Sequence, residues 1–128
     1  MKAHEFYAQV RDRGEYETAD EAKRVTTTVL GLLGERLAGG EGKDLAAQLP
    51  PELKAPLEGA VNSGHGFGVE EFLSRAALAL NASEETARWD VSAVLSTVAE
   101  AVSGGEVNQI LTQLQPAYAT LFGKPDLA

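Results

Sequence analysis

The sequence predicts an all-α protein, a helical bundle of about eight helices formed by two pseudo-repeats of about 65 residues. Apolar residues recur in both halves at the three- and four-residue spacing of an amphipathic helix. No stretch shows the sustained alternation of apolar and polar residues that indicates a strand. The string Gly-Gly-Glu occurs twice, 65 positions apart, which suggests that one helical unit was duplicated.

An ungapped alignment of residues 18–57 with residues 83–122 supports the duplication. Ten of the 40 aligned pairs are identical, and others keep their physical type, as Leu37 and Val102 do. With a shift of one residue the correspondence extends upstream. We therefore interpret the chain as a tandem repeat of one helical unit.

This alignment sets the expected domain organisation. A chain of 128 residues is long enough to bury its own core as one compact domain. We expect residues 1–128 to form a single helical domain with internal repeats at about 5–57 and 71–122. The glycine-rich stretch at 58–68 contains few apolar residues and is interpreted as the linker.

Each repeat contains one long helix, preceded by a shorter amphipathic helix at about 2–12 or 69–80. Thr18 and Ser83 are suited to cap the long helices. Within the first, we expect the hydroxyl of Thr26 to bond to the carbonyl one turn back. The apolar positions of the two long helices are Ala22, Thr26, Val29, Leu30, Leu33 and Leu37, and Ala87, Val91, Val94, Leu95, Val98 and Val102.

The strings Gly39-Gly40-Glu41 and Gly104-Gly105-Glu106 are predicted to separate each long helix from a shorter one. Glycine adopts the left-handed backbone that closes a helix at little cost, so the glycine pairs are expected to end the long helices. Each glutamate would then lie in the first turn of the next helix, where the dipole favours a negative charge. Pro51 and Pro116 suit the first position of one further short helix in each repeat.

Composition excludes several classes of function. The chain has 19 acidic and 11 basic residues, a net charge of −8, and no basic run, so binding to nucleic acid or to an anionic membrane is disfavoured. It has no cysteine, which removes disulfides and thiolate chemistry. No segment reaches 18 consecutive apolar residues, and the expected location is the cytoplasm.

The candidates for catalysis or metal binding are few. The two histidines, His4 and His65, lie 61 residues apart and belong to no recognisable metal-binding pattern. His65 lies in the glycine-rich loop, where it is either a solvated linker residue or a weak site for a ligand or for pH sensing. No catalytic motif is present, so we assign no catalytic residue, metal or cofactor and expect no enzyme.

Trp89 is the most informative single residue. It lies on the face of its predicted helix opposite the apolar stripe, and its aligned partner in the first repeat is Arg24. A large aromatic side chain on a polar face either contacts another segment of the same chain or marks an interface. Both alternatives stay open, and Trp89 and Arg24 are the candidate interface residues.

Several strings are more specific than a generic helical protein requires: EFYAQVRDRG, TADEAKRVTTTVLGLLGERLAGGEGKDLAAQLPPEL, FGVEEFLSRAA and GGEVNQILTQLQPAYATLF. In order and spacing they resemble the prokaryotic domain-of-unknown-function family 2267, over about residues 5–122. The resemblance implies a small all-helical protein with two similar halves and no established activity, cofactor or catalytic residue. The chain departs from the family pattern at Gln115, where a proline often follows leucine.

These observations favour a non-enzymatic protein-interaction or regulatory module, with a second copy of the chain or another protein as partner. The alternative is a small-molecule binding protein with an apolar pocket between the two helical repeats.

Overall fold

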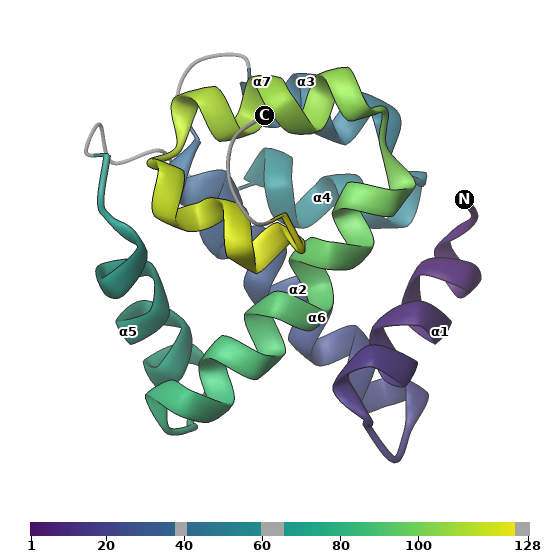
Figure 1. Cartoon of the computed structure of the whole chain (residues 1–128). Helices are drawn as coiled ribbons and strands as arrows, with labels where there is room; N and C mark the ends of the chain where they lie inside the picture. Colours follow the sequence, from purple (N-terminus) through teal and green to yellow (C-terminus); the bar gives the residue numbers. More distant parts are fainter. Residues whose placement is uncertain (38–40, 60–65, 125–128) are drawn as a thin grey trace.

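The computed structural model describes residues 1–37, 41–59 and 66–124 (Figure 1). The elements in chain order are α1 (Ala3–Gly14), α2 (Ala19–Arg36), α3 (Glu41–Gln48), α4 (Pro51–Gly59), α5 (Val69–Leu80), α6 (Glu84–Ala101), α7 (Gly104–Gln113) and the 3-10 helix η1 (Pro116–Phe122). Across these described residues there is no strand, which confirms the all-α fold. Within them, no helix has the length and apolar character needed to cross a membrane.

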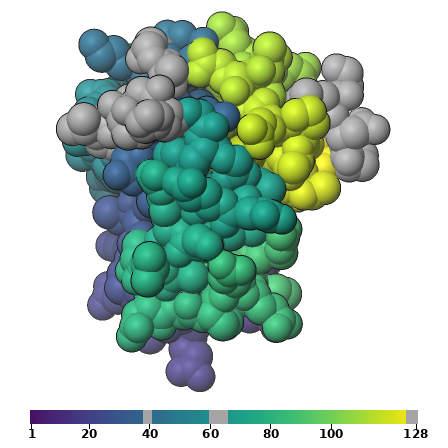
Figure 2. Space-filling view, turned by 90° about the vertical axis from the view of Figure 1, so that its left-hand side faces the viewer, coloured from purple at the N-terminus to yellow at the C-terminus, as the bar shows by residue number. Residues whose placement is uncertain are grey.

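The two long helices, α2 and α6, pack against each other at the centre of the bundle (Figure 1). The shorter helices α1 and α5 flank them, and each packs against both long helices. At the other end α4 packs on α2 and α3, while η1 packs on α6 and α7. Figure 2 faces α5, which crosses the middle of that side with α2 to one side and η1 to the other.

Both long helices form where the sequence predicts them, and both begin at a capping side chain. Thr18 Oγ1 accepts a hydrogen bond from the backbone N–H of Glu21 at 3.1 Å, and Ser83 Oγ accepts one from Thr86 N–H at the same distance. All twelve positions of the predicted apolar stripes are buried. These stripes meet at the centre of the bundle and supply much of its core.

The predicted glycine stop is wrong in the second half of the chain. Helix α6 already ends at Ala101, and Gly104 and Gly105 form the first turn of α7. The reason is Ser103, whose Oγ accepts a hydrogen bond from the Glu106 backbone N–H at 3.1 Å and so starts the next helix at once. Glycine is therefore not needed to end α6. The first pair, Gly39-Gly40, lies outside the described residues.

The expected hydrogen bond of the Thr26 hydroxyl is also wrong. Thr26 is fully buried, and its Oγ1 has no hydrogen-bond partner. The surrounding stripe is apolar, and the aligned position in α6 is Val91, a residue of the same shape without the hydroxyl. Thr26 thus serves as a core residue that carries an unsatisfied polar atom.

Corresponding helices of the two halves begin at nearly the same separation along the sequence. Helices α1 and α5 begin 66 residues apart, and α2 and α6 begin 65 residues apart. The last element differs in type, because the segment after Pro116 forms a 3-10 helix where the segment after Pro51 forms an α-helix. The tandem duplication stays a prediction from the sequence.

The chain re-enters the described bundle at Phe67, whose carbonyl oxygen is held by two buried donors. Arg36 Nε donates to it at 2.7 Å and the Tyr118 hydroxyl at 2.8 Å. The Arg36 guanidinium also lies 5.9 Å and 5.5 Å from the ring centroids of Phe67 and Tyr118. These contacts hold the start of the second half of the chain against α2 and η1.

Candidate functional site

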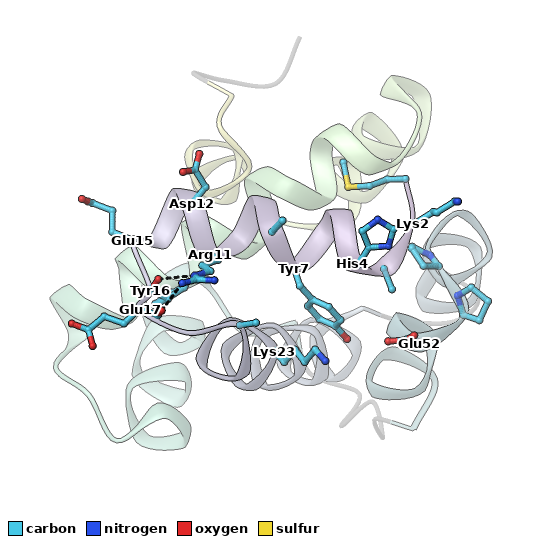
Figure 3. Close-up of a pocket in the computed structure, with 16 residues that line it drawn as sticks. Lys2, His4, Tyr7, Arg11, Asp12, Glu15, Tyr16, Glu17, Lys23 and Glu52 are labelled. Carbon is cyan, nitrogen blue, oxygen red and sulfur yellow. Dashed lines mark hydrogen bonds between the residues drawn. The ribbon is translucent and has the colours of Figure 1, made fainter.

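A groove of about 1060 Å³ lies along α1 (Figure 3). Its walls come from one face of α1, the turn at 15–17, the start of α2 and the start of α4. The lining residues are Met1, Lys2, Ala3, His4, Tyr7, Ala8, Arg11, Asp12, Glu15, Tyr16, Glu17, Ala19, Lys23, Pro50, Pro51 and Glu52.

The sequence of α1 explains why the groove follows the whole helix. Phe6 and Val10 face the core and are fully buried. His4, Ala8 and Arg11 recur every three to four residues on another face, and all three line the groove. A helix of 12 residues is about 18 Å long, so the groove is an extended surface feature.

The groove is open to solvent. Most of its lining side chains are exposed, and of the sixteen only Pro50 is buried. Ala3, Tyr7 and Tyr16 are partly buried. A drug-sized ligand normally loses most of its surface in an enclosed site, whereas an open trough of this length suits a segment of polypeptide.

Tyr7 lies in the middle of the groove, against the first turns of α2 (Figure 3). Lys23 Nζ is 5.4 Å from the centroid of the Tyr7 ring, within the range of a cation–π contact. Burial raises the pKa of the Tyr7 phenol, and the nearby charge of Glu52 raises it further. The phenol is therefore neutral at physiological pH and offers the groove a hydroxyl that can donate or accept a hydrogen bond.

The two ends of the groove differ in charge. Asp12, Glu15 and Glu17 lie together at one end, as Figure 3 shows. Arg11 lies beside them, but its guanidinium donates to two backbone carbonyls, Tyr16 O at 3.2 Å and Glu17 O at 2.6 Å. The opposite end carries both signs of charge, so the groove as a whole has one distinctly acidic end.

The predicted interface residue Trp89 is half exposed, at 50% of its surface, as the helical periodicity indicates. Its indole Nε1 donates a hydrogen bond to the carbonyl oxygen of Gly14 at 3.0 Å. The indole therefore makes an intramolecular contact through its polar edge and leaves much of its ring in solvent. Arg24 is exposed on α2, and its positive charge acts on Tyr16, two residues beyond Gly14.

A row of polar contacts beside Trp89 joins the end of α1 to α6. The Tyr16 hydroxyl donates to the buried Asp90 Oδ1 at 2.5 Å, and Arg13 forms an ion pair with Glu100 at 2.6 Å. Burial, followed by the hydrogen bond and charge of Asp90, raises the pKa of the Tyr16 phenol strongly, against an opposing effect of Arg24. These groups are structural ties between the two halves.

The glutamates of the two Gly-Gly-Glu strings lie in α3 and α7, two helices that a hydrogen bond between side chains joins. Gln109 Nε2 of α7 donates to Glu41 Oε1 of α3 at 3.2 Å. Glu41 Oε2 and Glu106 Oε1 are both buried and have no hydrogen-bond partner. Burial raises the pKa of the Glu106 carboxyl, and the charges of Glu41 and Asp44 raise it further.

The structure describes one of the two histidines. His4 lines the groove and is exposed, while His65 lies outside the described residues. In residues 1–37, 41–59 and 66–124, no group of three or more histidine, aspartate or glutamate side chains could hold a metal ion.

Comparison with known proteins places the chain in a family. Residues 3–121 match the model of the family described as "Uncharacterized conserved protein (DUF2267)". The chain belongs to the DUF2267 family. No curated protein matches it. Because the description of the family names no activity, the assignment of sites in this DUF2267 chain depends on its own geometry.

Sequence reasoning missed the groove and the buried glutamate oxygens of this DUF2267 protein. The recurring solvent-facing positions of α1 were visible as an amphipathic pattern, but nothing in the pattern showed that α2 and α4 leave that face uncovered. Glu41 and Glu106 were visible as aligned residues of the two repeats. Only the folded structure shows that each carboxylate has a buried oxygen without a hydrogen-bond partner, and that the charge of Glu41 acts on Glu106.

Proposed function

We propose that this DUF2267 chain is a non-enzymatic protein-interaction module that holds a segment of a partner protein in the groove along α1. The observation that supports the proposal most directly is the groove itself, which follows the full length of a helix and stays open to solvent. An amphipathic segment of about 12–14 residues would match its length of about 18–21 Å.

Charge favours a basic partner segment. The chain carries a net charge of −8, and Asp12, Glu15 and Glu17 concentrate negative charge at one end of the groove. Lysine or arginine side chains of a partner would meet these carboxylates, and the long-range field would steer a basic segment toward the surface. The middle of the groove, at Tyr7 and Ala8, offers aromatic and small apolar surface for the apolar face of the segment.

The alternative of a small-molecule pocket between the repeats is less well supported. The groove lies entirely within residues 1–52, that is, within the first half of the chain. Between the halves, α2 and α6 meet through fully buried residues such as Val29, Leu33, Val94 and Val98. A ligand between these helices would require them to separate.

The groove proposal is tested with two neighbouring substitutions on α1. Ala8→Arg places a bulky side chain on the groove face, whereas Gln9→Arg adds the same side chain at an exposed position outside the groove. The probe is a fluorescein-labelled basic amphipathic peptide, and fluorescence anisotropy measures its binding. We expect Ala8→Arg to weaken binding by about tenfold or more and Gln9→Arg to change it by less than about threefold.

A twin peptide with glutamate and aspartate in place of its basic residues is the charge control. It should bind more weakly than the basic peptide, and the difference should shrink at high salt. Equal loss of binding in the two arginine variants, or equal binding of the two peptides, would contradict the proposal.

Trp89 and Arg24 remain predicted contacts for self-association. We expect the wild-type chain to sediment faster as its concentration rises and Trp89→Ala to sediment as a monomer, because the exposed ring surface supplies contact area. Trp89→Phe keeps an aromatic ring while losing the N–H that donates to Gly14, and should retain self-association. A wild-type chain that stays monomeric over the concentration series would rule this contact out.

A further inference from the structure

We propose that the Tyr7 ring is an arginine-binding subsite of the groove, and that Lys23 occupies this subsite until an arginine of the partner segment displaces it. The inference rests on the proposed function, because it assigns one residue type of the bound segment to one place in the groove. The observation that carries it is a contact inside the groove, the ammonium of Lys23 over the ring of Tyr7.

Tyr7 and Lys23 meet in the groove, Tyr7 from α1 and Lys23 from α2 (Figure 3). Lys23 Nζ lies 5.4 Å from the centroid of the Tyr7 ring. The ring is partly buried, and it meets the buried Phe6 ring edge-on, with an angle of 88° between the two planes. Its neighbours thus position the ring, whose face offers a cation the negative side of its quadrupole.

Lys23 is held weakly at this ring. Its side chain is exposed, and it belongs to neither of the ion pairs found among the described residues. Cation–π contacts at exposed sites are weak, and the lysine stem is long and flexible. Rotation of this one side chain would uncover the ring without any movement of the backbone, as is common when partners bind.

An arginine of the partner suits this ring better than Lys23 does. The planar guanidinium stacks on an aromatic face and is less strongly hydrated than an ammonium. Its aliphatic stem can lie along the apolar surface at Ala8, so one arginine can use both the ring and the apolar middle of the groove. The same chain already shows such a contact, since the Arg75 guanidinium lies 3.9 Å from the centroid of the Phe67 ring.

Glu52 adds a negative charge to the subsite. It lies in the first turn of α4, is exposed and lines the groove. In Figure 3 the hydroxyl of Tyr7 points toward the side of the groove where Glu52 lies. Burial raises the pKa of the Tyr7 phenol and the charge of Glu52 raises it further, so this charge is felt at the ring. The carboxylate therefore favours a cation at the subsite.

The test compares two fluorescein-labelled amphipathic peptides of the same sequence and net charge. One carries arginine and the other lysine at every basic position, and fluorescence anisotropy measures their binding. We expect wild type to bind the arginine peptide about three- to fivefold more tightly. Tyr7→Phe keeps the ring and should keep this preference, whereas Tyr7→Leu should bind the two peptides equally.

Lys23→Ala tests the displacement. Alanine preserves the helix and leaves the ring free, so we expect the arginine peptide to bind about threefold more tightly or better. Lys43→Ala is the matched control, because it changes the net charge equally at an exposed position of α3 outside the groove. It should change binding by less than about 1.5-fold.

A double-mutant cycle shows whether the gain comes from the ring. If Lys23 competes for the Tyr7 ring, then Lys23→Ala should tighten binding in the wild-type and Tyr7→Phe backgrounds. In the Tyr7→Leu background the gain should fall to that of Lys43→Ala, because no ring is left to be vacated. Circular dichroism shows whether each variant is folded, and Tyr7→Phe keeps the test decisive if Tyr7→Leu does not fold.

Three results would overturn the arginine subsite while the groove proposal stands. They are equal binding of the two peptides to wild type, an arginine preference that persists in Tyr7→Leu, and a gain no larger for Lys23→Ala than for Lys43→Ala. In each of these cases Ala8→Arg would still weaken binding. If neither peptide binds wild type at all, the proposed function is wrong and the subsite is wrong with it.

Discussion

Gly14→Ala is expected to lower the free energy of unfolding by about 2–3 kcal/mol. A Cβ atom at Gly14 would lie 2.1 Å from Cε2 and 2.3 Å from Cζ of the Tyr16 ring. The ring would have to move, and its hydroxyl would leave the buried Asp90 carboxylate to which it donates. Removing that donor leaves a desolvated charge without a partner. Urea unfolding followed by circular dichroism measures the loss.

Gly31→Ala is the matched control for this substitution. Gly31 lies in the interior of α2, and a Cβ atom there would meet nothing within 4 Å. Alanine favours the helix over glycine, so this variant should gain about 0.5–1 kcal/mol. The two substitutions are thus expected to change the free energy of unfolding in opposite directions. Two glycine-to-alanine changes that shift stability in the same direction would show that the Tyr16 ring is not fixed against Gly14.

Arg36→Ala is expected to cost about 3 kcal/mol. Arg36 is 6% exposed and donates to the Phe67 carbonyl at 2.7 Å, so truncation removes both a buried hydrogen bond and the packing of a long side chain. Tyr118 would remain as the other donor to that carbonyl. Urea unfolding measures the loss. An unchanged slope of the free energy of unfolding against urea concentration would show that the folded state is otherwise intact.

Arg75→Ala is the control for the arginine. Arg75 also lies over the Phe67 ring, 3.9 Å from its centroid, but it is partly exposed and pairs with Glu71 on the surface of α5. Exposed ion pairs contribute little, so this variant should lose less than about 1 kcal/mol. If the two arginine variants were equally stable, the buried contact of Arg36 with Phe67 would not be what holds the start of the second half in place.

Helix positions were the most predictable part of the fold. The stripe from Ala22 to Leu37 has one dominant spacing, and every residue of it is buried. Thr18 and Ser83 were predictable as caps because their side chains act on a backbone N–H three residues away. Because these interactions join residues that are close together in the chain, they can be predicted from the order of residues.

The prediction that Gly104 and Gly105 end the second long helix was wrong, and the reason is again local. Ser103 precedes Gly104 and Gly105, and its side chain decides where α7 starts. At the ends of α1 and α5, by contrast, Glu15 and Asn81 adopt the left-handed backbone with φ of 56° and 54°. Residues other than glycine can therefore close a helix here, so glycine alone does not locate the ends.

Contacts across the bundle could not be predicted from spacing. The bond from Tyr16 to Asp90 joins residues 74 positions apart, and the Arg36 contact with Phe67 has no counterpart at the aligned residue Ala101. The sequence did place Trp89 on an outward face, and half of its surface is exposed. The hydrogen bond from the indole Nε1 of Trp89 to the Gly14 carbonyl depends instead on how α1 packs against α6.

The groove along α1 is proposed to bind a basic segment of a partner protein. Nuclear magnetic resonance with ¹⁵N-labelled protein tests it most directly, as the basic peptide is titrated into the sample. We expect chemical-shift changes in α1, in residues 15–23 and at the start of α4, while α5 stays unchanged. Changes centred on α5 and α6, or no changes at millimolar peptide, would contradict it.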